Sequence, residues 1–356
     1  MPKHDVIVIG ASAGGVEAIS RIVAELPRDI RASVLVVLHI SRGRSMLPEI
    51  LTRAGRLPAT HPTDGEPLHY GRIYVGVPDH HLLVQDGTVR VVHSASENGL
   101  RPAVDPLFRS AARAYGPRVL GVVLTGALDD GTSGVAAIKE GGGITIAQDP
   151  DEAFSPGMPR SAISSGKIDH VLPLRDIPLL LTALVEEEAP AMVTGRTHAH
   201  LRAMEPDLAE VPLAVYPGDR PGTPSVFSCP ECHGTLWEVE DDGLLRFRCR
   251  VGHVYSPDSM MAAQTDEVDR ALWTALRTLE ERAALAHKLA ERGRARSHPW
   301  VDRAFTQRAR EAEKEALQIR TLLRTRGGAI HNVPEDAATA SAGPGDPGTV
   351  LPEGQD

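Results

Sequence analysis

The chain has 356 residues, of which 42% are hydrophobic, and a formal net charge of -9. Its length suits two domains and a tail. The acidic balance argues against partners such as nucleic acid or an anionic membrane surface, and no apolar run approaches the ~20 residues that span a bilayer. No signal peptide is expected. The only three cysteines, all within Cys229 to Cys249, favour a reducing compartment, here the cytoplasm.

Residues 1–185 alternate short apolar runs with helical patterns. The runs are β-branched and apolar on both faces, as in a parallel sheet covered by helices on both sides: DVIVIG, ASVLVVLH, RVLGVVLTG and GITIAQ. The helix-like stretches lie near 15–26, 45–54, 104–115 and 131–140. HLLVQ, Asp86-Gly87 and TVRVV predict an antiparallel hairpin at one edge. The predicted fold class is α/β, a mostly parallel doubly wound sheet with this hairpin insertion.

Four further segments follow the α/β domain. Residues 186–224 are acidic and then rich in Pro and Gly, which indicates a flexible linker, and residues 225–257 hold a small Cys/His module. Residues 258–328 predict a helical hairpin, and residues 329–356 have the composition of a disordered tail. Apolar residues recur at helical spacing on both sides of a bend at RARSHPW: Val268, Leu272, Leu276 and Leu279, then Phe305, Ala312, Leu317 and Leu322.

The stretch VIVIGASAGG, residues 6–15, leads from an apolar strand into a glycine-rich turn. The pattern Gly10-x-Ser12-x-x-Gly15 between a strand and a helix fits a dinucleotide-binding loop. However, serine replaces the second glycine of that loop, and the next strand ends on His39 where an acidic residue would hold a ribose. The other interpretation is a nucleophilic serine on a sharp turn.

Ser12, His39 and an aspartate, Asp129 or Asp130, each follow a predicted strand. The carboxyl ends of parallel strands form one edge of the sheet, so these side chains can meet there as nucleophile, base and orienting acid. Taken singly, each has a plainer interpretation: a capping serine, a core histidine, and an Asp-Gly turn or helix cap. The residues alone leave both interpretations open.

Six segments resemble, in order and spacing, the catalytic domain of chemotaxis protein-glutamate methylesterases over nearly all of residues 5–180. They are VIGASAGGVEAI, VLHIS, GRIYVGVPDHHLLV, RPAVDPLFRSAA, VVLTGALDDGTSGVAAIKEGGGITIAQDPDEAFSPGMPRSAI and GKIDHVLPL. The resemblance implies Ser12 as nucleophile, His39 as base and Asp130, which immediately precedes a glycine as in the family's pattern, as orienting acid. It implies hydrolysis of glutamyl γ-methyl esters on chemoreceptor cytoplasmic helices with release of methanol and, in some members, deamidation of glutamine.

Ester cleavage also needs N–H donors for the oxyanion. The candidates are the backbone amide of Ala13 and those around Gly126 and Ala127, while Gly14 would keep the approach open to a substrate side chain. Methionine is common in the family in place of Ala127. No cofactor is expected for catalysis.

The resemblance implies a methylated chemoreceptor or receptor-like protein as partner. The family usually carries a receiver domain ahead of the catalytic domain. Here the catalytic segment starts at the first residues, so control by aspartyl phosphorylation is expected only from a separate response-regulator partner. The alternative function is a non-catalytic signalling or scaffold module that retains the fold and binds a protein or a nucleotide.

The cysteines form a metal-binding pattern. Cys229-x-x-Cys232 and Cys249-x-x-x-His253 flank a predicted hairpin, LWEVE, Asp242-Gly243 and LLRFR, and supply the four ligands of a structural Zn²⁺. His233 is a rival fourth ligand, though its adjacency to Cys232 makes it sterically poorer than His253. A redox C-x-x-C is the other interpretation, but no thioredoxin-like βαβ pattern surrounds it.

The long linker at 186–224 predicts weak coupling between the α/β domain and the zinc module. We therefore expect, from the sequence, that hydrolysis of a small ester survives removal of the metal.

Overall fold

The computed structural model describes residues 2–40, 43–191, 222–241 and 243–330. The chain divides into two compact units, Met1–Gln264 and Thr265–Asp356. In the described part of the chain, no helix has both the length and the apolar character of a membrane span. Residues 192–221 of the expected linker and 331–356 of the expected tail lie outside the described residues.

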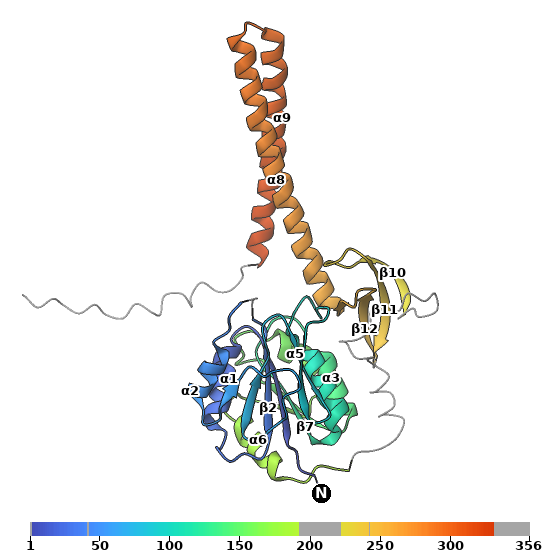
Figure 1. The fold of residues 1–356 in the computed structure, drawn as a ribbon. Coiled ribbons are helices and arrows are strands. Elements are labelled where there is room, and N and C mark those ends of the chain that lie inside the picture. The colour runs from blue at the N-terminus through green and yellow to red at the C-terminus, as the bar shows by residue number, and fades with distance from the viewer. Residues whose placement is uncertain (1, 41–42, 192–221, 242, 331–356) are drawn as a thin grey trace, which may run out of the picture. The chain divides into compact units, whose positions relative to one another are not determined.

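A seven-stranded sheet forms the centre of the first unit (Figure 1). Its strand order is β3-β4-β2-β1-β7-β8-β9, and every neighbouring pair is parallel. The strands are β1 (Val6–Ala11), β2 (Ser33–Leu38), β3 (Ala59–Thr60), β4 (Arg72–Val75), β7 (Val119–Val123), β8 (Ile144–Gln148) and β9 (His170–Leu172). The apolar runs of the central strands β1, β2 and β7 are buried throughout because helices cover both sides, which confirms the doubly wound α/β prediction.

Two hydrophobic cores lie on the two faces of this sheet. One packs α1 (Gly15–Glu25), α2 (Leu47–Ala54) and α6 (Ile177–Glu186) against it, and the other packs α3 (Val104–Tyr115), α4 (Thr132–Glu140) and α5 (Gly157–Ser164). The chain after β1 enters α1 on the first face, whereas α4, which follows the neighbouring strand β7, lies on the second. The crossovers therefore change sides beside β1, where doubly wound sheets open a crevice for a site.

The predicted hairpin is present as β5 (His81–Gln85) and β6 (Thr88–Val92). Asp86 and Gly87 have φ of 46° and 81°, which suits the two-residue turn that matches strand twist. The hairpin forms its own two-stranded sheet rather than an edge of the main sheet, because its apolar side chains pack into the core beside α3.

A four-stranded antiparallel ribbon carries the cysteines. Its order is β10 (Thr223–Ser228), β11 (Thr235–Asp241), β12 (Leu244–Cys249) and β13 (Val254–Tyr255). The expected hairpin is β11–β12, and the ribbon begins at Thr223, slightly earlier than the predicted boundary. Its core is small: Cys229, Leu236, Phe247, Cys249, Tyr255 and Met260.

Two long helices follow, α8 (Pro257–Ala295) and α9 (Pro299–Ile330), as the periodicity predicts. The buried seam between them is mostly alanine: Leu276, Ala283, Ala286, Ala290, Ala309, Ala312 and Ala316. Leu317 and Leu322, which recur at helical spacing in the sequence, are 54% and 46% exposed. Alanine fills the seam because small side chains let two helices approach closely, which leaves larger residues at its margin.

Candidate active site and metal centre

Three predicted site residues follow three adjacent strands of the sheet. Ser12 comes directly after β1, His39 directly after β2, and Asp130 ends the loop after β7. Because β1 lies between β2 and β7 in the parallel sheet, the three residues share its carboxyl edge at the point where the helices change sides. The strand order thus brings together residues that are 118 positions apart at most.

His39 and Asp130 are joined by a hydrogen bond. His39 Nε2 lies 2.7 Å from Asp130 Oδ2, and the two side chains are 8% and 2% exposed. The amides of Val104 and Asp105 also donate to the Asp130 carboxylate, at 2.6 and 3.2 Å. Burial raises the pKa of Asp130, but the hydrogen bonds from His39 and Val104 outweigh it and hold that pKa below its usual range. Asp130 is therefore an anion placed to orient an imidazole.

Asp129, the rival acid, points elsewhere. Its Oδ1 accepts hydrogen bonds from the hydroxyls of Ser256 and Ser259, at 2.8 and 3.0 Å. The preference for Asp130 over Asp129 agrees with this geometry, because only Asp130 reaches His39.

Backbone hydrogen bonds hold the turn that carries Ser12. Its amide donates to the Thr125 carbonyl at 2.9 Å, and its own carbonyl accepts the Gly15 amide at 2.8 Å. Gly14 adopts φ 75°, a left-handed conformation that lets the turn enter α1. Within the described residues Ser12 Oγ makes no hydrogen bond to His39, as is common before a substrate tightens such a site.

Thr125 connects the loops around Ser12, although the sequence reading did not single it out. Its Oγ1 donates to the Ala13 carbonyl and accepts the Ser155 amide, both at 2.8 Å. It follows β7 at the same sheet edge, and that position is the signal that could have identified it.

The oxyanion candidates separate into two groups. The Gly126 amide donates to the Ser155 carbonyl at 2.8 Å, so it would have to exchange this partner before it could serve an oxyanion, and that role stays a prediction. Gly126 is also needed for close approach, because a Cβ there would lie 2.9 Å from the Ser12 Cβ and 2.1 Å from the Met158 sulfur. The amides of Ala13 and Ala127 remain as donors.

Two exposed apolar side chains border this edge and were not predicted as site residues. Phe154 is 80% exposed and lies against Gly14, where an added Cβ would stand 2.7 Å from the Phe154 Cβ. Leu128, in the loop before Asp130, is 42% exposed and has φ 61°. A non-glycine residue in this left-handed region carries backbone strain, which is common beside functional sites.

The cysteine module brings its four predicted ligands together. One ligand atom each from Cys229, Cys232, Cys249 and His253 lies within 4.8 Å of the others, and the Cys232 and Cys249 sulfurs are 3.6 Å apart. His253 Nδ1 is 3.5 Å from the sulfurs of Cys229 and Cys249. Zinc–sulfur bonds of 2.3 Å in a tetrahedron separate two sulfurs by about 3.8 Å, so the cluster fits a zinc ion.

His233, the rival ligand, is exposed and outside this group of four. It lies in a left-handed turn after Cys232, with φ 58°, and its amide donates to the Cys229 carbonyl at 2.8 Å. Glu231 Oε2 lies 3.5 Å from the other ring nitrogen of His253 and would orient it.

The family model described as CheB methylesterase matches residues 7–181. A putative protein-glutamate methylesterase/protein-glutamine glutaminase of Leptospira interrogans is 37% identical over 184 residues, which cover 51% of this chain and 95% of that protein. The chain belongs to the CheB methylesterase family. The resemblance read from the sequence is thereby confirmed.

Other CheB relatives match over the same part of the chain. The protein-glutamate methylesterase/protein-glutamine glutaminase 2 of Anaeromyxobacter dehalogenans is 40% identical over 183 residues, 51% of this chain and 54% of that protein. The chain thus spans about half the length of the first such relatives. The crystal structure of the Thermotoga maritima CheB methylesterase catalytic domain matches with a TM-score of 0.49 and 36% identity, over 51% of this chain and 98% of that one.

Proposed function

We propose that the CheB-family domain is a serine hydrolase that removes γ-methyl esters from glutamyl residues on the cytoplasmic helices of a chemoreceptor or receptor-like protein, and deamidates glutamine there. The observation that carries this proposal is the 2.7 Å hydrogen bond between His39 and Asp130, on the strand-end edge that also holds Ser12. The printed names of its relatives, methylesterase and glutaminase, support the reaction class.

The chemistry assigns one role to each residue. Because His39 uses Nε2 for Asp130, Nδ1 is the ring nitrogen that takes the Ser12 proton as Oγ attacks the ester carbonyl. The anionic Asp130 fixes this tautomer and stabilises the imidazolium. His39 then returns the proton to the departing methoxide, which leaves as methanol, and activates a water that hydrolyses the acyl-serine.

The tetrahedral intermediate places a negative charge on the former carbonyl oxygen. The Ala13 amide stands just before the N-terminus of α1, where the helix dipole favours an anion, and the Ala127 amide belongs to the loop that leads to Asp130. Phe154 and Leu128 give this edge an apolar border for a helix that presents a glutamyl ester.

The decisive experiment measures methanol release from methylated receptor cytoplasmic fragments by the full chain, with Ser12→Ala as control. We expect turnover by the wild type and its loss in the variant. Labelling by a serine-reactive phosphonate separates the alternatives, because a hydrolase labels at Ser12 whereas a binding module does not. Absence of both reactions would refute the proposal.

We also propose that Cys229, Cys232, Cys249 and His253 bind one structural zinc ion per chain. Their spacing supports tetrahedral S₃N coordination, and the ribbon's small core supports a need for the metal, since such modules take folding energy from it. Elemental analysis should find one zinc per chain, reduced in Cys229→Ser. A metal-free ribbon that remains folded would contradict this assignment.

A further inference from the structure

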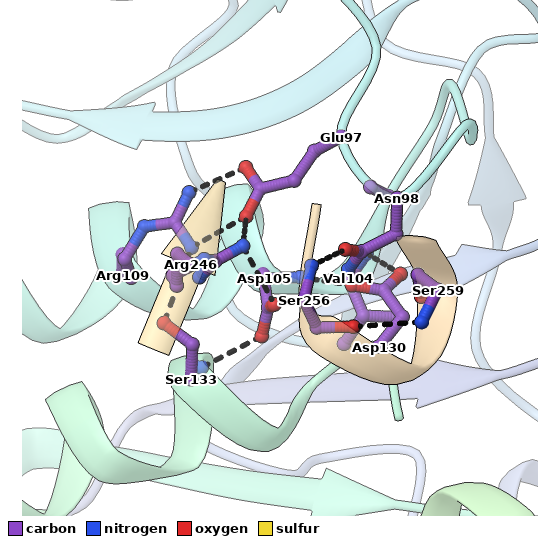
Figure 2. Close-up of polar contacts among 12 residues, drawn as sticks. Glu97, Asn98, Val104, Asp105, Arg109, Asp130, Ser133, Arg246, Ser256 and Ser259 are labelled. Carbon is purple, nitrogen blue, oxygen red and sulfur yellow. Dashed lines mark hydrogen bonds and ion pairs between the residues drawn. The ribbon is translucent and has the colours of Figure 1, made fainter. Parts of the chain in front are cut away.

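The ribbon and the segment that follows it contact the residues around Asp130 at two places (Figure 2). From β12, Arg246 extends into a buried cluster with Glu97, Asp105 and Arg109. From the segment where β13 leads into α8, Ser256 and Ser259 contact the residue next to Asp130. These contacts contradict the expectation that a long linker leaves the α/β domain and the ribbon weakly coupled.

The first connection is an ion cluster. Glu97 accepts two hydrogen bonds from Arg109, at 2.9 and 2.6 Å, and a third from Arg246 Nη2. The same Arg246 nitrogen lies 3.5 Å from Asp105 Oδ2. Every one of these side chains is buried, so the ribbon's guanidinium neutralises charge that water cannot reach.

Asp105 links this ion cluster to Asp130. Its backbone amide donates to Asp130 Oδ1, and its Oδ1 accepts the amides of Gly131 and Gly134, at 3.0 and 2.7 Å. Gly131, directly after Asp130, is the N-cap residue of α4, and Gly134 lies in the first turn of that helix. Asp105 therefore sets the position of Asp130 from both sides of the loop.

The second connection holds Asp129. Ser256 and Ser259 donate to its Oδ1, and the Ser256 amide donates to Asn98 Oδ1 at 2.9 Å. Asn98 in turn donates its amide to the Val254 carbonyl at 2.7 Å. The residue before the acid is thus fixed by the chain that leaves the metal centre.

Both connections depend on the proposed ligands. Arg246 lies in β12 three residues before Cys249, and Ser256 lies three residues after His253, so each connection is made close in sequence to a proposed ligand. The Glu231 carboxylate, between the first two cysteines, accepts hydrogen bonds from Ser96 of the α/β domain and from Tyr255. Loss of the metal would release all of these groups together.

We propose that the ribbon is a positioning element that holds Asp130 against His39, so that hydrolysis requires an intact Cys/His centre. It does so by two routes. Arg246 acts through Asp105, and Ser256 and Ser259 act through Asp129. This inference rests on the proposed hydrolase function for its kinetic consequence. Its geometric consequence, the His39–Asp130 contact, can be measured without turnover.

The test compares Arg246→Met with Arg250→Met in the full chain. Both changes remove one positive charge near the end of β12, but Arg250 is exposed and makes no ion pair among the described residues. We expect Arg246→Met to lower kcat on a small ester ~10–100-fold with KM within about twofold, the range seen when a supporting partner of a site is lost. Arg250→Met should match the wild type, and Arg246→Lys should recover part of the loss.

The second readout is the proton of the His39–Asp130 hydrogen bond, a downfield imidazole N–H resonance identified by its absence in His39→Ala. We expect Arg246→Met to shift or remove it. If Arg246→Met proves unstable, the Ser256→Ala/Ser259→Ala double variant removes the second connection and should weaken the same resonance. Wild-type resonance and wild-type kcat in both sets would overturn the proposal.

The metal is tested by Cys232→Ser and by chelation, each of which should lower kcat and weaken the His39 N–H resonance at least as much as Arg246→Met, because loss of the metal releases both connections. The double variant Cys232→Ser/Arg246→Met should be no worse than Cys232→Ser alone, because loss of the metal has already released the Arg246 connection. Multiplying losses would show that the metal centre does not act through Arg246. If the wild type hydrolyses no ester and labels with no phosphonate, the proposed function fails, while the resonance still decides the role of the ribbon.

Discussion

The buried carboxyl of Asp105 gives a prediction that does not depend on substrate. Burial raises the pKa of Asp105 to about 8, the nearby charge of Asp130 acts in the same direction, and Arg246 and Arg109 oppose it. With Asp105 protonated, the carboxylates of Glu97 and Asp130 balance the two guanidiniums. The carboxyl is therefore protonated in the folded chain at neutral pH and ionised in the unfolded chain.

The sign of the pH effect follows from this difference. A raised folded-state pKa contributes stability that is complete below the unfolded value of 3.8 and is lost as the pH rises through about 8. One proton of difference changes the free energy of unfolding by about 1.4 kcal/mol per pH unit, or about 3 kcal/mol between pH 5 and pH 7.

Asp105→Asn isolates this effect. The asparagine oxygen can still accept the Gly131 and Gly134 amides, and its amide group resembles the protonated carboxyl but does not titrate. Urea unfolding followed by far-ultraviolet circular dichroism should show the variant gaining about 3 kcal/mol relative to the wild type from pH 5 to pH 7. Tryptophan fluorescence is unsuited, because all three tryptophans lie beyond residue 185.

The matched control is Asp86→Asn, an exposed aspartate in the β5–β6 turn. It removes one carboxylate from the surface by the same substitution, and the pH dependence that it shows is the baseline for Asp105→Asn. An Asp105→Asn difference with no more pH dependence than this baseline would mean that Arg246 and Arg109 keep the carboxyl ionised, and would refute the charge balance among Glu97, Asp130 and the two guanidiniums.

Further predictions concern the active site. Ser12→Ala and His39→Ala should each lower kcat at least ~10³-fold. The double variant should be no worse than either single variant, because the residues act as one unit. A double variant whose loss of kcat equals the product of the two single losses would exclude the triad. Asp130→Asn should cost ~10⁴-fold through the wrong imidazole tautomer, and Asp129→Asn less than ~10-fold; the reverse order would reassign the acid. Gly126→Ala should reduce phosphonate labelling, because its Cβ would meet the Ser12 Cβ at 2.9 Å; unimpaired labelling would show that the loop can yield.

The strands and the site edge could be read from the sequence because local signals determine them. Apolar runs such as SVLVVL can be satisfied only by burial on both faces, and the residue after such a run must lie at the carboxyl edge of the sheet. The choice between Asp129 and Asp130 could not be read locally. It depends on which carboxylate turns inward to His39, and this is decided by groups from residues 104, 256 and 259.

The coupling of the ribbon to Asp130 could not be predicted from the sequence, for a different physical reason. The composition of a linker indicates the conformational freedom of that segment only. Whether the ribbon docks on the α/β domain depends on the side chains of their two contacting surfaces. Arg246 lies in an alternating strand where a charged residue ordinarily indicates a solvated face, yet it is 5% exposed. Only the folded chain shows that its partner, Glu97, lies 149 residues away.

The buried ion cluster also makes docking of the ribbon onto the α/β domain close to all-or-none. Attraction between charges is strong inside the protein, but any carboxylate left without its partner there is costly, on the order of 3–5 kcal/mol for a broken buried pair. Half-docked states of the ribbon, with Arg246 withdrawn and the Glu97 carboxylate still enclosed with only one of its two guanidinium partners, are therefore disfavoured relative to full docking or full release. The support of Asp130 should change between two states rather than by degrees. Titration of zinc into metal-free protein should accordingly restore kcat and the His39 N–H resonance in proportion to one another, and a resonance that recovered without activity would show that Asp130 is not the residue through which the ribbon acts.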